Sequence, residues 1–525
     1  MNIETDFLVV GSGIAGLSFA LKAAEYGKVM IVTKGELGEC NTDYAQGGIA
    51  SVMYDPDTFE KHIHDTLVCG AGICDRAAVE QVVTHAPTVI KQLIHWGAKF
   101  DKDGSGRYEL AREGGHSEHR ILHHKDITGH EIERALMRRV KRHHNIEIYE
   151  HHFAVDILTQ HHLGKLVKKS TPDITCFGAY VLNLKKHEIY TVLAKITVMA
   201  TGGVGNIYHT TTNPAVATGD GIAMVHRAKG AVENMQFLQF HPTSLYNPGE
   251  RPSFLISEAM RGFGALLRLQ NGKEFMHKYH PMGSLAPRDV VARGIDHELK
   301  ISGEEFVYLD ITHKDPREVT DHFPNIYKKC LSVGIDLTKD MIPVVPAAHY
   351  CCGGVKVNLN GESSIRHLYA LGETSSTGLH GGNRLASNSL MEAAVYADVA
   401  AQHAISLLNT IELQRNIPAW DYEGTAIPEE MALITQNYKE MQLIMSNYVG
   451  IVRSNLRLER AKRRLEIIFK ETEELYLKST LSQHLCELRN MIAVGYLIIK
   501  QAEAMHESVG LHYSIDYPAK PVNME

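Results

Sequence analysis

The sequence Gly11-Ser12-Gly13-Ile14-Ala15-Gly16 decides which fold this chain is expected to adopt. It follows an apolar run at residues 7–10 and leads into an Ala-rich apolar segment at 14–26, after which a second apolar run occupies 28–33. Three glycines at this spacing allow a tight turn from strand to helix and a close approach to a pyrophosphate, which the helix N-terminus attracts. The order of strand, turn, helix and strand predicts a Rossmann-like, dinucleotide-binding α/β domain. It does not indicate which dinucleotide is bound.

Composition narrows the class of protein. The chain has 525 residues, 44% of them hydrophobic and 22% charged, which is typical of a globular protein of two or three domains. The net charge of −7 and the lack of a long basic stripe argue against nucleic acid as the main partner. No apolar run approaches the length of a membrane helix, and the early first strand leaves no room for a signal peptide, so no membrane association is expected.

The cysteines and histidines indicate no bound metal. Eight cysteines without a CxxC pair fit reduced thiols in the cytoplasm, and no iron–sulfur ligand spacing occurs. Histidines are frequent between residues 119 and 152, but carboxylates or thiols at ligand spacing are missing there. We therefore expect a metal-free chain, and any iron–sulfur electron transfer would require a second protein.

Two segments after the glycine turn are candidates for contact with the dinucleotide. Lys34 follows the second strand where an NAD enzyme would carry an acid; it suits a phosphate or a flavin nucleotide, although a solvated loop residue is an open alternative. The next segment contains paired glycines, which let the backbone lie flat against a planar ligand. It reads Asn41-Thr42-Asp43-Tyr44-Ala45-Gln46-Gly47-Gly48.

Helical patterns follow this loop. Residues 75–96 are expected to be helical, with Pro87 starting a second segment or a kink. Thr128 and Glu131 form a predicted capping box for a helix whose basic end, with Arg138, Arg139, Lys141 and Arg142, suits a helix C-terminus.

The remaining pattern predicts three domains. A Rossmann-like dinucleotide-binding domain is expected at 1–234 and 351–420, an inserted α+β capping domain at 235–350 and a three-helix bundle at 421–525. Within the first domain, the strand at 153–158, the helix start at 219–221, the strand at 368–373 and the helix from 388 place further residues near the cofactor. These residues are Val155, Asp220, Glu373, Ser389 and Leu390.

A set of polar residues in the cap and in the facing loops is suited to a small dianion. Histidines, a hydroxyl and guanidiniums can bracket two carboxylates, and arginine can do so with paired hydrogen bonds. The set is His241, Ser257, Glu258, Arg288, His349 and Arg384, and the loop at 112–120 adds Glu113. Each residue alone also has a purely structural explanation, and a solvated loop is an alternative for 112–120.

These motifs resemble the succinate dehydrogenase and fumarate reductase flavoprotein family over essentially the whole chain. The resemblance implies FAD as cofactor, carboxylate binding by His241, Ser257, His349 and Arg384, and Arg288 as proton acceptor. Members that hold FAD covalently carry a histidine where this chain has Asn41, so non-covalent FAD is expected.

Glu113 favours one branch of that family. A carboxylate near the substrate would repel succinate but would pair with the ammonium group of an amino diacid. Arg112-Glu113-Gly114-Gly115-His116-Ser117 and the C-terminal residues 510–518 resemble the L-aspartate-oxidising branch. That branch implies oxidation of L-aspartate to iminoaspartate for quinolinate and NAD biosynthesis, with oxygen or fumarate as acceptor and quinolinate synthase as a possible partner. The alternatives are a fumarate reductase or succinate dehydrogenase flavoprotein subunit, and a non-catalytic flavin-binding protein.

Overall fold

The computed structural model describes residues 2–125, 127–427 and 431–518. Its centre is a seven-stranded sheet with the order β6-β2-β1-β9-β8-β7, in which β16 also pairs with β9. Strands β6, β2, β1, β9 and β16 are parallel to one another. Strand β8 pairs antiparallel with β9, and β7 pairs antiparallel with β8. These strands are β1 (Asn2–Val10), β2 (Val29–Thr33), β6 (Ile146–Glu150), β7 (His152–Leu158), β8 (Gly178–Asn183), β9 (Glu188–Met199) and β16 (Leu368–Ala370).

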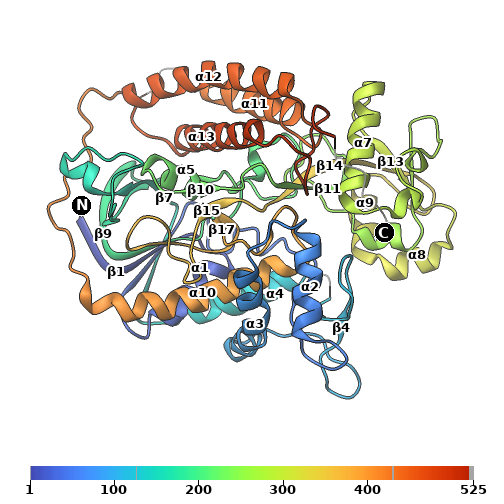
Figure 1. Ribbon diagram of the computed structural model, residues 1–525, viewed down its shortest axis with the longest axis horizontal. Helices are drawn as coiled ribbons and strands as arrows, with labels where there is room; N and C mark the ends of the chain where they lie inside the picture. Colours follow the sequence, from blue (N-terminus) through green and yellow to red (C-terminus); the bar gives the residue numbers. More distant parts are fainter. Residues whose placement is uncertain (1, 126, 428–430, 519–525) are drawn as a thin grey trace.

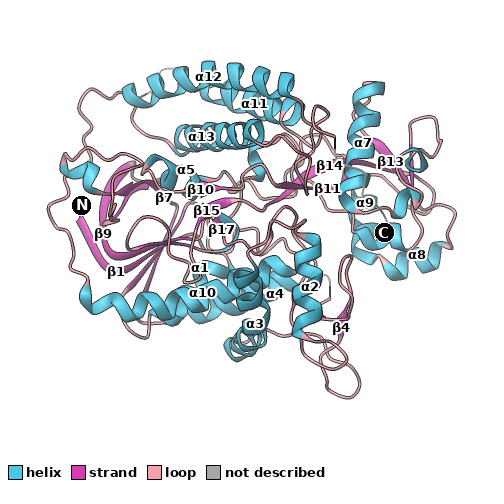
Figure 2. Cartoon of the chain, viewed as in Figure 1, coloured by secondary structure: helices cyan, strands magenta, loops and turns pink. Residues whose placement is uncertain are grey.

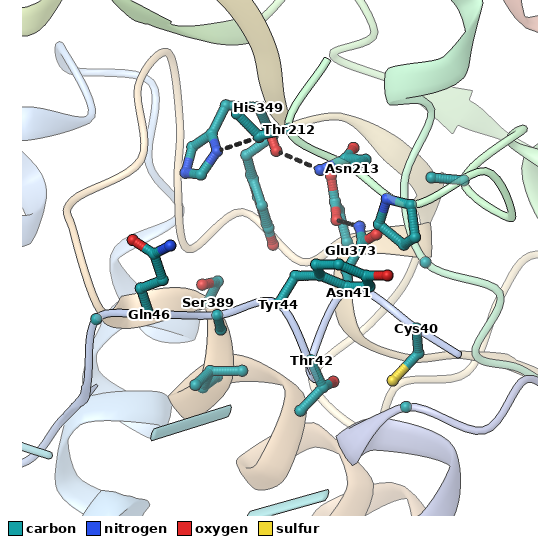
Figure 3. Close-up of a pocket in the computed structure, with 18 of the residues that line it drawn as sticks. Cys40, Asn41, Thr42, Tyr44, Gln46, Thr212, Asn213, His349, Glu373 and Ser389 are labelled. Atoms are coloured by element: carbon teal, nitrogen blue, oxygen red, sulfur yellow. Dashed lines mark hydrogen bonds between the residues drawn. The ribbon is translucent and has the colours of Figure 1, made fainter. Parts of the chain in front are cut away.

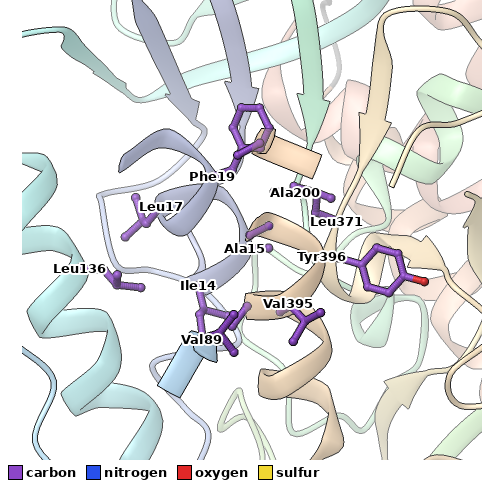
Figure 4. Close-up of a cluster of buried hydrophobic side chains, with 14 of the residues drawn as sticks. Ile14, Ala15, Leu17, Phe19, Val89, Leu136, Ala200, Leu371, Val395 and Tyr396 are labelled. Carbon is purple, nitrogen blue, oxygen red and sulfur yellow. The ribbon is translucent and has the colours of Figure 1, made fainter. Parts of the chain in front are cut away.

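Helices cover both faces of this sheet, as Figures 1 and 2 show. One face carries α1 (Ile14–Ala23), α3 (Arg76–Trp96), α4 (Thr128–Val140) and α10 (Asn388–Leu407), with α2 (Phe59–Cys69) beside α3. Leu17, Val89, Leu136 and Val395 from these helices meet in one buried cluster (Figure 4). The opposite face carries α5 (Asp220–Arg227) and the C-terminal helices α11 (Ala432–Tyr448), α12 (Asn455–Lys478) and α13 (Gln483–Ala504).

The cap has a sheet and a hydrophobic core of its own. Its strand order is β11-β14-β13-β12, all antiparallel. These strands are β11 (Leu238–Leu245), β12 (Leu266–Arg268), β13 (Val307–Asp310) and β14 (Ile342–Cys351), and the helices are α6 (Glu258–Gly262), α7 (Arg288–Ser302), α8 (Pro316–His322) and α9 (Pro324–Ser332). Because β11 and β14 extend out of the FAD-binding half, the cap stands at one end of the molecule (Figure 1).

Short elements complete the fold. Two small sheets comprise β3 (Ile49–Ala50), β4 (Leu110–Ala111) and β5 (Ile121–Leu122), and β10 (Val232–Glu233), β15 (Gly354–Lys356) and β17 (Ser375–Ser376). The 3₁₀ turns are η1 (Gln160–Leu163), η2 (Gly205–Ile207), η3 (Met276–Lys278), η4 (Gly283–Leu285), η5 (Gly372–Thr374) and η6 (Leu408–Thr410). Among the described residues, no helix combines the length and apolarity needed to cross a bilayer.

The glycine turn packs as its sequence predicts. A Cβ on Gly11, which has φ +111°, would lie 2.1 Å from the carbonyl oxygen of Ala200 at the end of β9. A Cβ on Gly16 would lie 2.3 Å from the carbonyl oxygen of Gly11. Only glycine allows β1, α1 and β9 to meet this closely.

One local prediction about helices is confirmed in part and another is wrong. Helix α3 is continuous through Pro87, so no second segment begins there, and the alternative of a kink at Pro87 stays a prediction. The capping box at α4 does not form: Ile127 is the N-cap residue, and the Thr128 hydroxyl accepts a hydrogen bond from His124 N. Glu131 instead accepts from Lys99 N at 2.9 Å and pairs with Arg134, because a tertiary contact competes for its carboxylate.

Helix α4 also buries a carboxyl group. Neither oxygen of Glu133 has a hydrogen-bond partner within the described part of the chain, and the thiol of Cys40 lies beside it. Burial raises the pKa of Glu133 to about 8. This raised pKa contributes stability that is fully present below the pKa of the unfolded glutamate, 4.5, and is lost as the pH rises toward about 8.

We predict that Glu133→Gln flattens the pH dependence of stability. In urea unfolding, the wild type should lose a few kcal/mol between about pH 5 and about pH 8, while the variant should change much less. Glu131→Gln is the control: Arg134 lowers the pKa of Glu131 despite burial, so this variant should be destabilised but keep the wild-type slope. An unchanged slope in Glu133→Gln would contradict the assignment.

Candidate active site

One cavity of about 980 Å³ extends from the glycine turn to the cap. Most of the predicted cofactor residues line it: Gly11, Ser12, Gly13, Ile14, Ala15, Lys34, Asn41, Thr42, Tyr44, Ala45, Gln46, Gly47, Gly48, Asp220, Glu373, Ser389 and Leu390. The predicted polar cluster of the cap and its facing loops lines the same cavity. The glycine turn and the cap residues therefore belong to one site.

Three predicted cofactor residues do not line the cavity. Gly16 packs against the glycine turn itself, and Asp43 points to His130, whose Nδ1 lies 2.8 Å from Asp43 Oδ1. Val155 is buried in an apolar cluster, and its carbonyl accepts a hydrogen bond from Arg227. Gly16 and Asp43 therefore contact neighbouring parts of the protein instead of the cavity, and Val155 belongs to an apolar core cluster.

Asn41 and Glu373 form a hydrogen-bonded pair in the cavity wall (Figure 3). Asn41 Nδ2 donates to Glu373 Oε2 at 2.7 Å, and Cys351 N donates to Glu373 Oε1 at 3.0 Å. Burial raises the pKa of Glu373 to about 7. Asn41 Oδ1 is buried without a hydrogen-bond partner in the described structure, and it can accept a hydrogen bond from a hydroxyl group of a bound ligand.

The lined surface fits FAD. Gly13 has no side chain, and its backbone lies beside Thr42 and Cys40. The glycine turn therefore leaves the cavity open where a pyrophosphate would bind. Asn41 offers an amide and no nucleophile for a covalent flavin bond. The residues present therefore fit a flavin dinucleotide held without a covalent link.

Lys34 has a role that the sequence did not indicate. Its Nζ is 2.7 Å from both Asp220 Oδ2 and Glu487 Oε1 and donates to Thr218 at 2.6 Å. Burial alone would lower the pKa of Lys34, but the two carboxylates outweigh it and raise the pKa. Lys34 is thus not a solvated loop residue, and it ties β2 to α5 and α13; its contact with the cofactor stays a prediction.

Two neutral histidines stand at the cap end of the cavity. The rings of His241 and His349 are 5.7 Å apart, and His349 Nδ1 is 2.8 Å from the Thr212 hydroxyl (Figure 3). His241 Nδ1 is 3.1 Å from the Thr243 carbonyl oxygen and 3.3 Å from its amide nitrogen. Burial, together with nearby arginine charges, holds the pKa of both histidines well below the usual range.

Arg288 begins helix α7 and pairs with Glu258 at the start of α6. Glu258 Oε1 also lies 3.4 Å from Arg261 Nη2. Burial alone would raise the pKa of Glu258, but the charges of Arg288 and Arg261 lower it overall. Ser257, the N-cap of α6, accepts a hydrogen bond from Ala259 N and keeps its own hydroxyl hydrogen for another acceptor.

Arg384 is buried and held on several sides. Its Nε and Nη2 donate to Gln239 Oε1 at 3.2 and 2.9 Å, and its Nη1 donates to Ser389 at 3.1 Å. Its guanidinium carbon lies 4.6 Å from the centre of the Tyr350 ring. This support orients one guanidinium at the junction of the cap and the FAD-binding half.

Glu113 faces the same cavity from the loop after β4. Ser387 donates to Glu113 Oε2 at 2.6 Å, and Glu113 Oε1 lies 3.0 Å from a Cβ built on Gly47. A Cβ on the next residue, Gly114, would lie 3.7 Å from Glu258 Oε1. The loop therefore brings Glu113 between the segment 41–48 and the Arg288–Glu258 pair.

The sequence reasoning missed the residues that hold this cluster in position. Gln239, which positions Arg384, lies two residues before His241 on β11, and the alternation of strand residues could have suggested a shared face. Thr212 and Arg261 carry no comparable local signal. Thr212 contacts a residue 137 positions away.

Sequence and structure comparisons place the chain among flavoproteins. The profile described as "FAD binding domain" matches residues 6–390, and "Fumarate reductase flavoprotein C-term" matches residues 438–521. The structure resembles the FrdA chain of E. coli quinol fumarate reductase with a TM-score of 0.86 and 29% identity, covering 100% of this chain and 94% of that chain. The class is therefore an FAD-dependent flavoprotein with a cap, which confirms the predicted cofactor and fold class.

Curated relatives define the family more narrowly. An L-aspartate oxidase of Vibrio cholerae is 46% identical over 98% of this chain and 96% of that protein, and one of Yersinia pestis is 48% identical with the same coverage. The chain belongs to the L-aspartate oxidase family of the fumarate reductase-like flavoproteins. This confirms the resemblance drawn from the sequence.

Lys34→Met tests whether the buried lysine stabilises the fold. Removing the cation leaves Asp220 and Glu487 buried without their partner, so unfolding free energy should fall by about 3–5 kcal/mol in chemical denaturation. Lys28→Met, at an exposed lysine just before β2, should change stability by less than about 0.5 kcal/mol. If Lys34 instead acted chiefly on a phosphate, the variant would lose FAD affinity while the FAD-free protein kept its stability.

Proposed function

We propose that this chain oxidises L-aspartate to iminoaspartate with non-covalently bound FAD, and that oxygen or fumarate reoxidises the flavin. The observation that carries this proposal is that Glu113 shares one cavity with the cationic and histidine cluster. The names of the curated relatives support the same reaction. In this reaction the substrate loses two hydrogens, one as hydride and one as a proton.

The cluster can hold both carboxylates of the substrate. We assign this binding to His241, Ser257, His349 and Arg384, all of which line the cavity. If Thr243 N–H and the Thr212 hydroxyl donate to the two Nδ1 atoms, each histidine carries its hydrogen on Nε2 and presents a donor to the substrate. Because both rings are neutral, they contribute direction rather than charge, and Arg384 supplies the charge.

Glu113 gives the site its preference for an amino diacid. A carboxylate in a cavity built for anions costs binding energy unless a cation neutralises it. The ammonium group of aspartate supplies that cation, whereas succinate has none. The Ser387 hydroxyl holds the Glu113 carboxylate in place.

Arg288 is the proposed proton acceptor. Because a guanidinium normally holds all its protons, Arg288 can accept one only if another leaves, and Glu258 at its Nε is the group that can receive it. The charges that lower the pKa of Glu258 make this transfer costly, so we assign it to the moment at which the substrate proton arrives. FAD, when bound, accepts the hydride.

The cellular setting follows from the reaction. The product would supply quinolinate formation in NAD biosynthesis, and quinolinate synthase is the partner expected to consume it. We place the protein in the cytoplasm because its eight cysteines are all free thiols.

For the domain division we propose residues 1–234 with 351–420 for FAD, 235–350 for the cap and 421–525 for the helical domain.

A flavoprotein subunit of fumarate reductase is the second candidate, and the likeness to the FrdA chain favours it. Such a subunit, purified alone, would oxidise succinate with a dye and ignore aspartate. A non-catalytic flavin-binding protein would not bleach its flavin band on anaerobic mixing with aspartate. The comparison of aspartate and succinate under anaerobic conditions tests all three functions in one assay.

Glu113→Gln should separate the two dicarboxylate reactions. We expect kcat/KM for aspartate to fall about 10- to 100-fold, because the ammonium group loses its counter-charge, while fumarate reduction should stay unchanged or rise, because residue 113 no longer repels that dianion. Glu109→Gln, at an exposed position before β4, is the matched control and should leave both reactions unchanged. Equal losses on both substrates would remove the ammonium argument.

Arg288→Leu should abolish aspartate oxidation without loss of FAD. The expected fall in kcat is about 10³-fold or more, within the range for removal of an acid–base group. The visible spectrum before and after acid precipitation reports retained FAD. Arg293→Leu, one turn further along α7, should keep most activity; retained turnover in Arg288→Leu would assign the proton to another group.

A further inference from the structure

A second cavity of about 360 Å³ lies where α3 and α4 both end. Its wall includes Arg134, Arg138, Arg139 and Arg142 from α4 and the segment that follows it, with Trp96 at the end of α3. Two histidines complete the wall, and no acidic residue of the described chain lines it. The cavity is large enough for a small ligand.

Most of the positive charge in this cavity has no counter-charge. Arg134 pairs with Glu131 and donates to the Gly97 carbonyl. Arg138, Arg139 and Arg142 are exposed, and within the described ranges none lies at ion-pair distance from a carboxylate. A chain with net charge −7 thus concentrates three unpaired guanidiniums within five positions.

Favourable interaction with the C-terminus of α4 does not by itself account for three unpaired arginines. Cations in the last turn of a helix interact favourably with its dipole, which explains one or two of them. Arg134 and Arg138, however, stand at the i and i+4 positions of α4, and like charges at this spacing destabilise a helix. A bound anion would remove that repulsion.

The hydrogen-bond donors of this cavity indicate which kind of ligand fits it. Guanidinium groups carry only N–H donors in a planar fork, which matches the oxygens of a phosphate. We propose that this cavity binds an anion with a pyrophosphate group, either as a free inorganic or small organic diphosphate or as part of a nucleotide. In the nucleotide case, the half-buried indole of Trp96 provides a surface against which a base can stack.

This cavity is separate from the proposed active site. Helix α4 begins beside the segment 41–48, where Gly129 N donates to the Ala45 carbonyl at 3.0 Å. It ends at the arginines, 13 residues later, which corresponds to about 20 Å of helix. The two cavities have no lining residue in common.

Calorimetric titration of FAD-loaded protein with inorganic pyrophosphate and with ADP tests the proposal. FAD loading keeps ADP out of the large cavity. We compare the wild type with the triple variant Arg138→Ala, Arg139→Ala, Arg142→Ala. The matched control replaces three exposed arginines on α12 by alanine, namely Arg460, Arg463 and Arg464.

Saturable binding to the wild type and the α12 control, weakened at least about 30-fold in the triple variant, would support the site. ADP binding tighter than pyrophosphate, with the difference lost in Trp96→Leu, would identify the nucleotide as the source of the diphosphate. Equal affinities would identify the free diphosphate. No saturable heat with the wild type, or equal weakening in both triple variants, would overturn the proposal. A retained flavin spectrum in each variant shows that the protein is folded.

Discussion

The contact of Gly11 with the end of β9 is the constraint on which the FAD-binding half depends. Because neither Gly11 nor Gly16 carries a side chain, β1, α1 and Ala200 approach to backbone distance. That approach opens the start of α1 toward the cavity and brings the loop after β9 to the same place. The segment 41–48 and Glu373 line the same opening, so a side chain at the turn would displace three segments at once.

The cap solves a second problem, which is to hold positive charge in a protein with a net negative charge. Arg384 is buried, and its charge is spread over Gln239, Ser389 and the face of Tyr350 rather than cancelled by a carboxylate. Arg288, in contrast, is paired with Glu258. Among the described residues, one guanidinium thus has no carboxylate partner, while the other is already paired with one. The neutral histidines fill the space between them without adding repulsion.

The sequence predicted the parts of the site that depend on local pattern. The glycine turn, the paired glycines at 47 and 48 and the start of α10 each have a short motif, and the family resemblance supplied the cap residues. Contacts between distant segments carry no such signal. Lys34 pairs with carboxylates 186 and 453 positions away, and Glu131 accepts a hydrogen bond from Lys99 N in the loop after α3 instead of capping its own helix. The local sequence around a lysine after β2 does not distinguish a lysine that binds a phosphate from one that pairs with two buried carboxylates.

Helix α4 links the cofactor end of the FAD-binding half to the arginine cluster at the end of the helix. Its first turn donates a hydrogen bond to the segment 41–48, its middle buries Glu133 beside Cys40, and Met137 packs against Gly38. The helix is packed along its length into the same core as α1 and α10, so it moves as one body or not at all. A ligand at its basic end changes FAD affinity only if it shifts that body, and in that case FAD must change the affinity of the ligand by the same factor. Reciprocal titrations would then show equal coupling in both directions, whereas a rigid α4 would show none.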